Sequence, residues 1–176
     1  MKRQRVSIKI LSLAGLYVLV GIFALVSGVS AQEETKTAEA EKAGAEFTAS
    51  KQIAAPGETI LLTIKLKLAE GAHSNSNNPT DPLLIPTVFI PKKSESIEWG
   101  AIEYPEATEV IASYSAEPLK VFEDGAEIKV EVKIKDDFKE NNLKIEGRLR
   151  IQVCDDEQCY PPKTISLNTQ IEVKKK

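Results

Sequence analysis

The chain of 176 residues is poor in the residues that most often carry chemistry, with one histidine, one methionine, one tryptophan and two cysteines. No Ser-His-Asp arrangement, phosphate-binding glycine loop or separated pair of carboxylates stands out, so hydrolase chemistry has little support. The single histidine, His73, has no cluster of metal ligands around it in sequence, and the sole methionine is Met1. We therefore expect no cofactor and no bound metal, and we expect His73 to support the nearby turn at Asn78-Pro79 by hydrogen bonding.

The sequence also has only one long apolar run, which extends from Ile10 to Val26. Four basic residues and no acid precede or begin this run, and the small residues Val29-Ser30-Ala31 follow it, an order typical of an export signal. We predict that residues 1–31 form a signal peptide. Since the run is long for a cleaved signal, an uncleaved membrane anchor is the alternative, and membrane association is expected only through this end.

The chain also lacks an excess of positive charge. Residues 1–31 hold four of the 23 basic residues and none of the 26 acidic ones, so the remainder has a formal charge of about −7. This balance argues against nucleic acid or an anionic membrane as the main partner. Residues 32–44 contain no large apolar residue and are expected to be a flexible linker. Residues 45–176 are long enough for one domain with a core.

A helical repeat longer than two turns is absent after residue 45, and the dominant period of apolar residues is two. Prolines, glycines and asparagines separate the alternating segments and predict turns. We predict an all-β fold, an immunoglobulin-like antiparallel β-sandwich of seven or eight short strands. The clearest predicted strands are residues 62–68, 128–134, 145–153 and 165–173, and weaker ones are residues 46–53, 86–90, 97–104 and 119–122.

What the sequence does have is a close pair of cysteines, Cys154 and Cys159, in a chain predicted to be exported to a compartment where disulfides persist. The two flank one hairpin connection, so they cannot form the long-range disulfide of an immunoglobulin core. If Val153 points inward, Cys154 lies on the outer face with Gln152, unless the strand bends there. A bond between the cysteines would close a loop of about six residues, where the entropic gain is smallest.

The residues around the pair leave its role open. The acids between the cysteines, Asp155, Asp156 and Glu157, should raise the thiol pKa, so that reaction would depend on the thiolate of a docked partner. We expect this triplet to be a solvated loop tip rather than a calcium site. Pro161 and Pro162 fix the backbone after Cys159. On the residues alone, a redox pair and a passive staple are equally supported.

Three segments of the chain together resemble a known family. They are Cys154 to Pro162; Gly71-Ala72-His73 with Asn78-Pro79 and Pro86-Thr87; and Tyr104-Pro105 followed by residues 121–125. In this order and spacing they are similar to the amino-terminal periplasmic domain of the thiol:disulfide interchange protein DsbD family. The resemblance covers roughly residues 45 to 173, which is nearly all of the predicted domain.

This resemblance implies an immunoglobulin-like fold and a thiol relay in the bacterial periplasm. A thioredoxin-like donor would reduce the cysteine pair, and the pair would reduce periplasmic disulfide proteins, as an oxidoreductase component of protein-disulfide reductase type. Cys159 would be the sulfur exposed to partners and Cys154 the resolving thiol. A loop between Tyr104-Pro105 and Val121 would shield the pair, with Tyr114 as the candidate covering aromatic. We expect a monomer.

The sequence also departs from the family pattern. Ala72 replaces a tryptophan, and residues 74–77 replace an aromatic stretch with small polar residues. Full-length members continue into a membrane electron carrier and a thioredoxin-like domain, so separate proteins are expected to supply electrons here. The alternative is a non-catalytic binding or assembly domain with a structural loop disulfide. A third hypothesis is a metal chaperone that uses His73 and two thiolates to hold zinc or copper(I).

Overall fold

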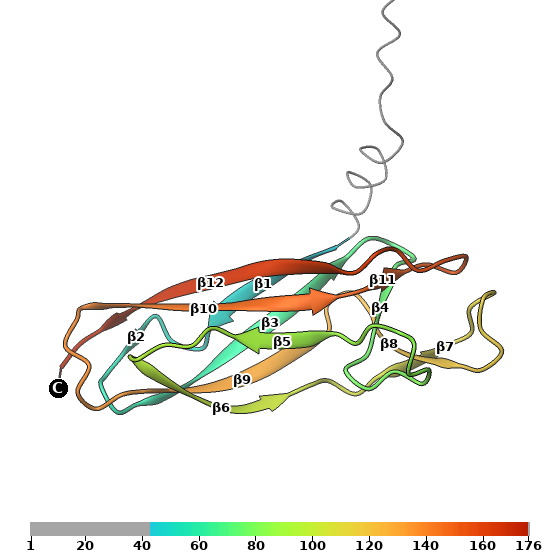
Figure 1. Cartoon of the computed structure of the whole chain (residues 1–176). Helices are drawn as coiled ribbons and strands as arrows, with labels where there is room; N and C mark the ends of the chain where they lie inside the picture. Colours follow the sequence, from blue (N-terminus) through green and yellow to red (C-terminus); the bar gives the residue numbers. More distant parts are fainter. Residues whose placement is uncertain (1–42, 176) are drawn as a thin grey trace, which may run out of the picture.

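The computed structural model describes residues 43–175, so the predicted signal peptide and most of the predicted linker lie outside the described residues. The described part contains twelve strands (Figure 1), and no helix in it could cross a membrane. The strands are β1 (Ala43–Ala49), β2 (Ile53–Ala54), β3 (Thr59–Leu68), β4 (His73–Asn75), β5 (Val88–Pro91), β6 (Ile97–Glu103), β7 (Thr108–Val110), β8 (Leu119–Phe122), β9 (Glu127–Ile134), β10 (Asn142–Ile151), β11 (Val153–Cys154) and β12 (Lys163–Val173).

Two four-stranded sheets form the body of the molecule, with strand orders β1-β3-β9-β6 and β2-β12-β10-β5. Their pairings are antiparallel, apart from the short parallel pairing of β2 with β12. The predicted all-β, immunoglobulin-like sandwich is confirmed. Strand β1 begins at Ala43, two residues before the expected start of the domain at residue 45.

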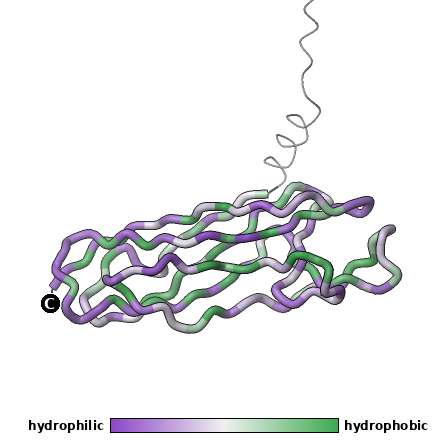
Figure 2. Tube along the Cα trace, viewed as in Figure 1, coloured by the Kyte–Doolittle hydropathy of each residue, from purple (hydrophilic) through white to green (hydrophobic). Residues whose placement is uncertain are grey.

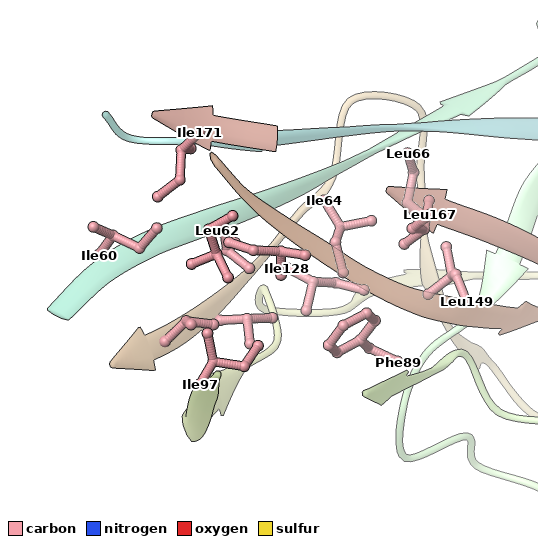
Figure 3. Close-up of a cluster of buried hydrophobic side chains, with 14 of the residues drawn as sticks. Ile60, Leu62, Ile64, Leu66, Phe89, Ile97, Ile128, Leu149, Leu167 and Ile171 are labelled. Atoms are coloured by element: carbon pink, nitrogen blue, oxygen red, sulfur yellow. The ribbon is translucent and has the colours of Figure 1, made fainter. Parts of the chain in front are cut away.

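The alternation of apolar and polar residues decides which face of each strand is buried. Along β3 and β9 every second side chain is fully buried, and the register pairs Leu62 with Val130 and Ile64 with Ile128. The same alternation is visible along the strands in Figure 2. Side chains from the two sheets point toward one another and fill the space between them (Figure 3). Each such Leu or Ile stabilises the fold by about 1.5–3 kcal/mol relative to an exposed side chain.

Aromatic side chains close one edge of this core. Phe89 of β5 packs edge-on against Trp99 of β6, with ring centroids 5.6 Å apart. The Trp99 indole Nε1 donates a hydrogen bond to the Lys92 carbonyl oxygen at 3.0 Å. Trp99 therefore packs at the edge strand of its sheet.

A third, smaller sheet lies at one end of the sandwich, on the right in Figure 1, with strand order β11-β4-β8-β7. Its strands continue from the larger sheets: β11 follows β10 after one residue, β4 follows β3 through a turn at Gly71, and β8 leads into β9 through a turn at Gly125. Both glycines have positive φ angles, 74° and 81°, which L side chains rarely adopt. The end sheet carries both cysteines and most of the segments that resemble the DsbD family.

Candidate functional site: a disulfide hairpin under a covering loop

Cys154 and Cys159 form a disulfide across a tight hairpin, and their Cα atoms are 3.9 Å apart. The two residues lie directly opposite each other, between the backbone hydrogen bonds from Tyr160 N to Val153 O (2.8 Å) and from Asp155 N to Gln158 O (2.9 Å). Backbone pairing thus holds the two sulfur atoms together on one face of the hairpin. The disulfide closes the tip of the molecule rather than joining the two large sheets.

The Cys154 side chain is fully buried, which corrects the prediction that it lies on the outer face. Val153 and Cys154 are both buried, so the alternation of β10 is broken between Ile151 and Cys154. The reason is the exception that the sequence left open, a bend in the strand. After Ile151 the chain leaves its pairing with β12, and residues 153 and 154 pair with Ser74 and His73 of β4 instead. Cys159 is only partly buried, so it is the more accessible sulfur.

The Gln152 side chain fixes this bend. Its Oε1 accepts hydrogen bonds from Asn75 Nδ2 at 3.0 Å and from the Ile85 backbone amide at 3.1 Å. Its Nε2 donates to the Tyr160 carbonyl oxygen at 3.1 Å. One amide therefore ties together β4, the loop that follows β4 and the chain beyond Cys159. Sequence reasoning placed Gln152 among the exposed polar residues of the strand and missed this role.

Three of the four small polar residues that depart from the family pattern are buried beneath the hairpin, and Asn77 is exposed. Ser74, Asn75 and Ser76 are each at most 1% exposed. Thr87 Oγ1 donates to the Asn75 carbonyl oxygen at 2.6 Å, and the Thr87 amide donates to the Ser76 carbonyl oxygen at 3.2 Å. Hydrogen bonds thus satisfy most of the polar groups buried in this segment. Within the described residues Asn75 Oδ1 is buried without a partner.

A loop between β7 and β8 lies over the disulfide, as the resemblance implies. The Tyr114 hydroxyl is 3.5 Å from Cys159 Sγ and 3.4 Å from His73 Nε2. Ser113 fastens the loop to the hairpin, because its amide and its hydroxyl both donate to the Asp156 carbonyl oxygen, at 3.2 and 2.7 Å. The Tyr114 side chain remains 39% exposed, so it covers the sulfur while facing solvent itself.

His73 lies beside the disulfide, and the prediction that it supports the Asn78-Pro79 turn is wrong. It is 5% exposed and pairs with Cys154 in the register of β4 and β11. The contact of its ring is with Tyr114, while the Asn78 amide is held by Ser76 Oγ at 3.2 Å. The position of His73 in a Gly-X-His segment of the resemblance is the signal that could have placed it here.

Burial shifts the pKa of each of the two ring groups beside the disulfide in the direction that favours its uncharged form. Burial lowers the pKa of His73 below its ordinary value, against the carboxylates of Asp156, Asp155 and Glu123, which act in the opposite direction. Burial also raises the pKa of the Tyr114 hydroxyl, and Asp155 and Asp156 raise it further. The site therefore contains a neutral imidazole and a neutral phenol next to a sulfur atom.

The acidic triplet is a solvated loop tip only in part. Asp156 and Glu157 are exposed. Asp155 instead shapes the turn, since its Oδ1 accepts from the amides of Glu157 (3.1 Å) and Gln158 (3.0 Å) and its Oδ2 accepts from the Tyr160 hydroxyl (2.5 Å). Among residues 43–175 no group of three or more His, Cys, Asp or Glu side chains is placed to hold a metal ion.

A cleft of about 550 Å³ lies beside the disulfide end, between residues 68–73, Val110 of β7 and the turn that follows β8. Its lining includes His73, Glu123 and Asp156, so one wall of the cleft is acidic. Residues from the segments that resemble the DsbD family, His73, Glu123 and Asp156 among them, therefore come together at the disulfide end.

Residues 40–171 match the family model of the N-terminal region of the thiol:disulfide interchange protein DsbD. The chain belongs to this family. This member of the thiol:disulfide interchange family carries a disulfide, Cys154–Cys159, of the kind that thiol–disulfide exchange requires. The resemblance inferred from the three sequence segments is confirmed.

Three solved structures similar to this DsbD-family chain are distant from it in sequence. The N-terminal periplasmic domain of ScsB from Proteus mirabilis is 15% identical with a TM-score of 0.48, and the match covers 73% of this chain and 46% of that one. The reduced DsbD N-terminal domain of Neisseria meningitidis is 14% identical (TM-score 0.40; 72% and 89% covered). A type I cohesin of ScaB from Pseudobacteroides cellulosolvens is 12% identical (TM-score 0.41; 74% and 92% covered).

The chain thus spans less than half of the ScsB structure that it matches. No curated protein sequence matches the chain.

Proposed function

We propose that this domain relays electrons in the bacterial periplasm, from a thioredoxin-like donor to disulfide-containing client proteins, through the Cys154–Cys159 pair. The observation that carries the proposal is the asymmetry of the disulfide. Cys154 is fully buried, whereas Cys159 is partly exposed beneath a single tyrosine. A partner thiolate can therefore reach Cys159 Sγ. Cys154 Sγ is held beside it, where it can act first as the leaving group and later as the resolving thiol.

The reductive half of the relay begins with attack of a donor thiolate on Cys159 Sγ. The bond between the two sulfur atoms breaks, Cys154 leaves as a thiolate and takes up a proton, and a mixed disulfide joins Cys159 to the donor. The second thiol of the donor then attacks the donor's own sulfur and releases Cys159. Two electrons and two protons have passed to the domain, and the donor is left as a disulfide.

The oxidative half uses the same atoms in the reverse order. The Cys159 thiolate attacks a client disulfide, one client sulfur leaves as a thiolate and is protonated, and Cys154 then attacks Cys159 to free the second client thiol. Because Cys154 and Cys159 lie directly opposite each other in the hairpin, the resolving thiol stays beside the mixed disulfide. This proximity favours resolution over escape of the client complex.

Two observations support the location and the partners. The predicted signal peptide indicates export, and the family's domains are periplasmic. The acidic residues Asp156 and Glu157 beside the hairpin disfavour spontaneous thiolate formation, which agrees with a reductive half in which the donor brings its own thiolate.

Trapping tests the relay directly. In a Cys154→Ser variant the mixed disulfide at Cys159 cannot be resolved by the domain. Cys159 is first converted to its mixed disulfide with thionitrobenzoate, and a thioredoxin-like protein that lacks its own resolving cysteine should then displace thionitrobenzoate and accumulate as a covalent complex. The matched Cys159→Ser variant, whose remaining sulfur is buried, should trap little. A reduction potential below about −300 mV, the range of structural disulfides, together with no complex from either variant would favour the non-catalytic binding domain.

A further inference from the structure

The side chains of His73, Cys154 and Cys159 form a row on one face of the end sheet. Cys154 pairs with His73 of β4 on one side and with Cys159 across the hairpin on the other. Residues directly opposite each other in antiparallel pairs place their side chains on the same face, with Cβ atoms about 4.5–5.5 Å apart. An imidazole and two sulfur atoms thus lie side by side across three neighbouring strand segments.

Tyr114 bridges the two ends of this row. Its hydroxyl lies 3.4 Å from His73 Nε2 and 3.5 Å from Cys159 Sγ. The sulfur of a disulfide carries no hydrogen, so the tyrosine is the only possible donor in the contact with Cys159. Both contacts are long, as contacts of reacting groups often are before a partner is bound. In the reduced protein Cys159 gains a hydrogen that it can direct at the Tyr114 oxygen.

We propose that His73 acts through Tyr114 as the proton acceptor for Cys159 when the reduced domain attacks a client disulfide. This inference rests on the proposed relay and assigns a proton path to it. The Cys159 thiol passes its proton to the Tyr114 oxygen, and the Tyr114 hydroxyl passes its own proton to His73 Nε2. The products are a thiolate, a neutral phenol and an imidazolium, and no electron moves in this step. His73 is thus a positioning residue that acts through Tyr114.

The charged groups around His73 suit this role. Asp155 and Asp156 face it from the hairpin and Glu123 faces it from the end of β8, while Tyr114 is the titratable group of the covering loop. Burial keeps the imidazole neutral and therefore able to accept a proton. The three carboxylates then stabilise the imidazolium, which in turn offsets their repulsion of the adjacent thiolate.

The test is the pH dependence with which iodoacetamide alkylates reduced Cys159. It is measured in the complete chain carrying Cys154→Ser, alone and combined with His73→Gln or Tyr114→Phe. We expect both combined variants to raise the pKa of Cys159 by about one unit, which lowers the alkylation rate at pH 7 about tenfold. Tyr104→Phe is the matched control, because the Tyr104 hydroxyl contacts the Phe89 amide and no sulfur; it should leave the pKa of Cys159 unchanged.

A purely structural role of His73 would change the alkylation rate by the same factor at every pH without moving the pKa. An unchanged pKa in Tyr114→Phe, whose half-exposed ring makes misfolding no concern, would overturn the inference even if His73→Gln failed to fold. The relay itself is judged by disulfide exchange with a thioredoxin-like protein. If disulfide exchange occurs but the pKa of Cys159 is the same in the variants, only the proton path is rejected. If no exchange occurs, the relay itself is rejected.

Discussion

Among the residues that take no part in disulfide exchange, Gln152 contributes most to the structure of the disulfide site. It lies where the chain passes from one large sheet into the end sheet, and its side chain makes three hydrogen bonds there. Without them, Asn75 Nδ2 would keep only the Ile85 carbonyl oxygen as an acceptor, and the bend that buries Cys154 would lose its side-chain hydrogen bonds. The geometry of the reactive pair is thus set by a neutral amide outside the hairpin.

We predict that Gln152→Ala lowers the free energy of unfolding by about 2–4 kcal/mol, because it leaves buried donors and an acceptor unpaired. Urea unfolding followed by circular dichroism measures the loss. Gln170→Ala, at an exposed position of β12, is the matched control and should change the free energy of unfolding by no more than about 0.5 kcal/mol. Equal effects of the two substitutions would show that the three hydrogen bonds do not stabilise the bend.

At the scale of a strand, the approach of β5 to β10 depends on the absence of a side chain at Gly147. A Cβ atom there would lie 2.3 Å from Phe89 Cε2 and 2.6 Å from Phe89 Cζ. The ring fills the space above the glycine and extends the core from one sheet to Trp99 at the edge of the other. A larger residue would displace the ring from both neighbours.

Gly147→Ala should therefore lower the free energy of unfolding by about 1–3 kcal/mol through overpacking. Gly44→Ala is a control of the same chemistry in β1, where the nearest atom to the new Cβ would be 3.8 Å away. Thermal unfolding of both variants tests the difference. A Gly147→Ala protein as stable as Gly44→Ala would mean that Phe89 can move at no cost.

An ion-pair cluster on the outer face of β10 makes the stability of the fold depend on pH in the acid range. The carboxylate of Glu146 accepts hydrogen bonds from Lys92 Nζ at 2.7 Å and Lys144 Nζ at 2.9 Å. These bonds lower its pKa from 4.5 to about 2. Since the folded state holds the proton less tightly than the unfolded state, the stabilisation is present above about pH 4.5 and is lost as the pH falls toward 2.

Glu146→Gln should accordingly lower the urea midpoint at pH 6, and the difference from the wild type should shrink as the pH falls to 2. Added salt should reduce the difference at pH 6, because the cluster is exposed. Glu127→Gln, which removes an exposed carboxyl of β9 without an ion pair among the described residues, serves as the control. A difference that stays constant from pH 6 to pH 2 would contradict the assignment.

The long strands were predictable from the sequence, and the shortest strands of the end sheet were not. β3, β9, β10 and β12 are eight to eleven residues long with one buried face, so their period of two is unmistakable. The end-sheet strands β4, β7 and β11 have only two or three residues. In β4 the consecutive residues His73, Ser74 and Asn75 are all buried, and in β11 Val153 and Cys154 are, so no alternation marks them.

The same reasoning explains which parts of the site could be predicted. The cysteine pair and the covering loop with Tyr114 followed from local sequence and family resemblance. The inward orientation of Cys154, the role of Gln152 and the position of His73 depend on pairing between β11 and β4, which are about 80 residues apart in the chain. Pairing between residues so far apart in the chain produces no periodic pattern of apolar residues in either segment.

At the scale of the whole molecule, the core that stabilises the sandwich and the disulfide lie in different parts of the structure. The main hydrophobic core lies mostly between the two large sheets, and the disulfide closes a small hairpin beyond it. Loss of the disulfide removes the closure of a loop of about six residues, which corresponds to roughly 2 kcal/mol in the chain-entropy model. The fold should survive that loss.

We therefore predict that the double variant Cys154→Ser, Cys159→Ser remains folded, with an unfolding free energy lower by about 2 kcal/mol and an unchanged dependence on urea concentration. Amide hydrogen exchange should show β3 and β9 as protected as in the wild type, with faster exchange confined to β4, β11 and the hairpin. A double variant that unfolds altogether would show that the sandwich needs its disulfide.

Strand β12 starts next to the cysteine hairpin and runs the length of the sandwich to Val173, so the chain leaves the described structure at the far end (Figure 1). Eleven residues of strand span roughly 35 Å. A probe surface or fluorescent tag joined through Lys175 would therefore stand well clear of the sulfur atoms and leave them facing the bulk solution. Because of that distance, the carboxyl-terminal side is a suitable point for immobilising the protein when its association rates with other proteins are measured.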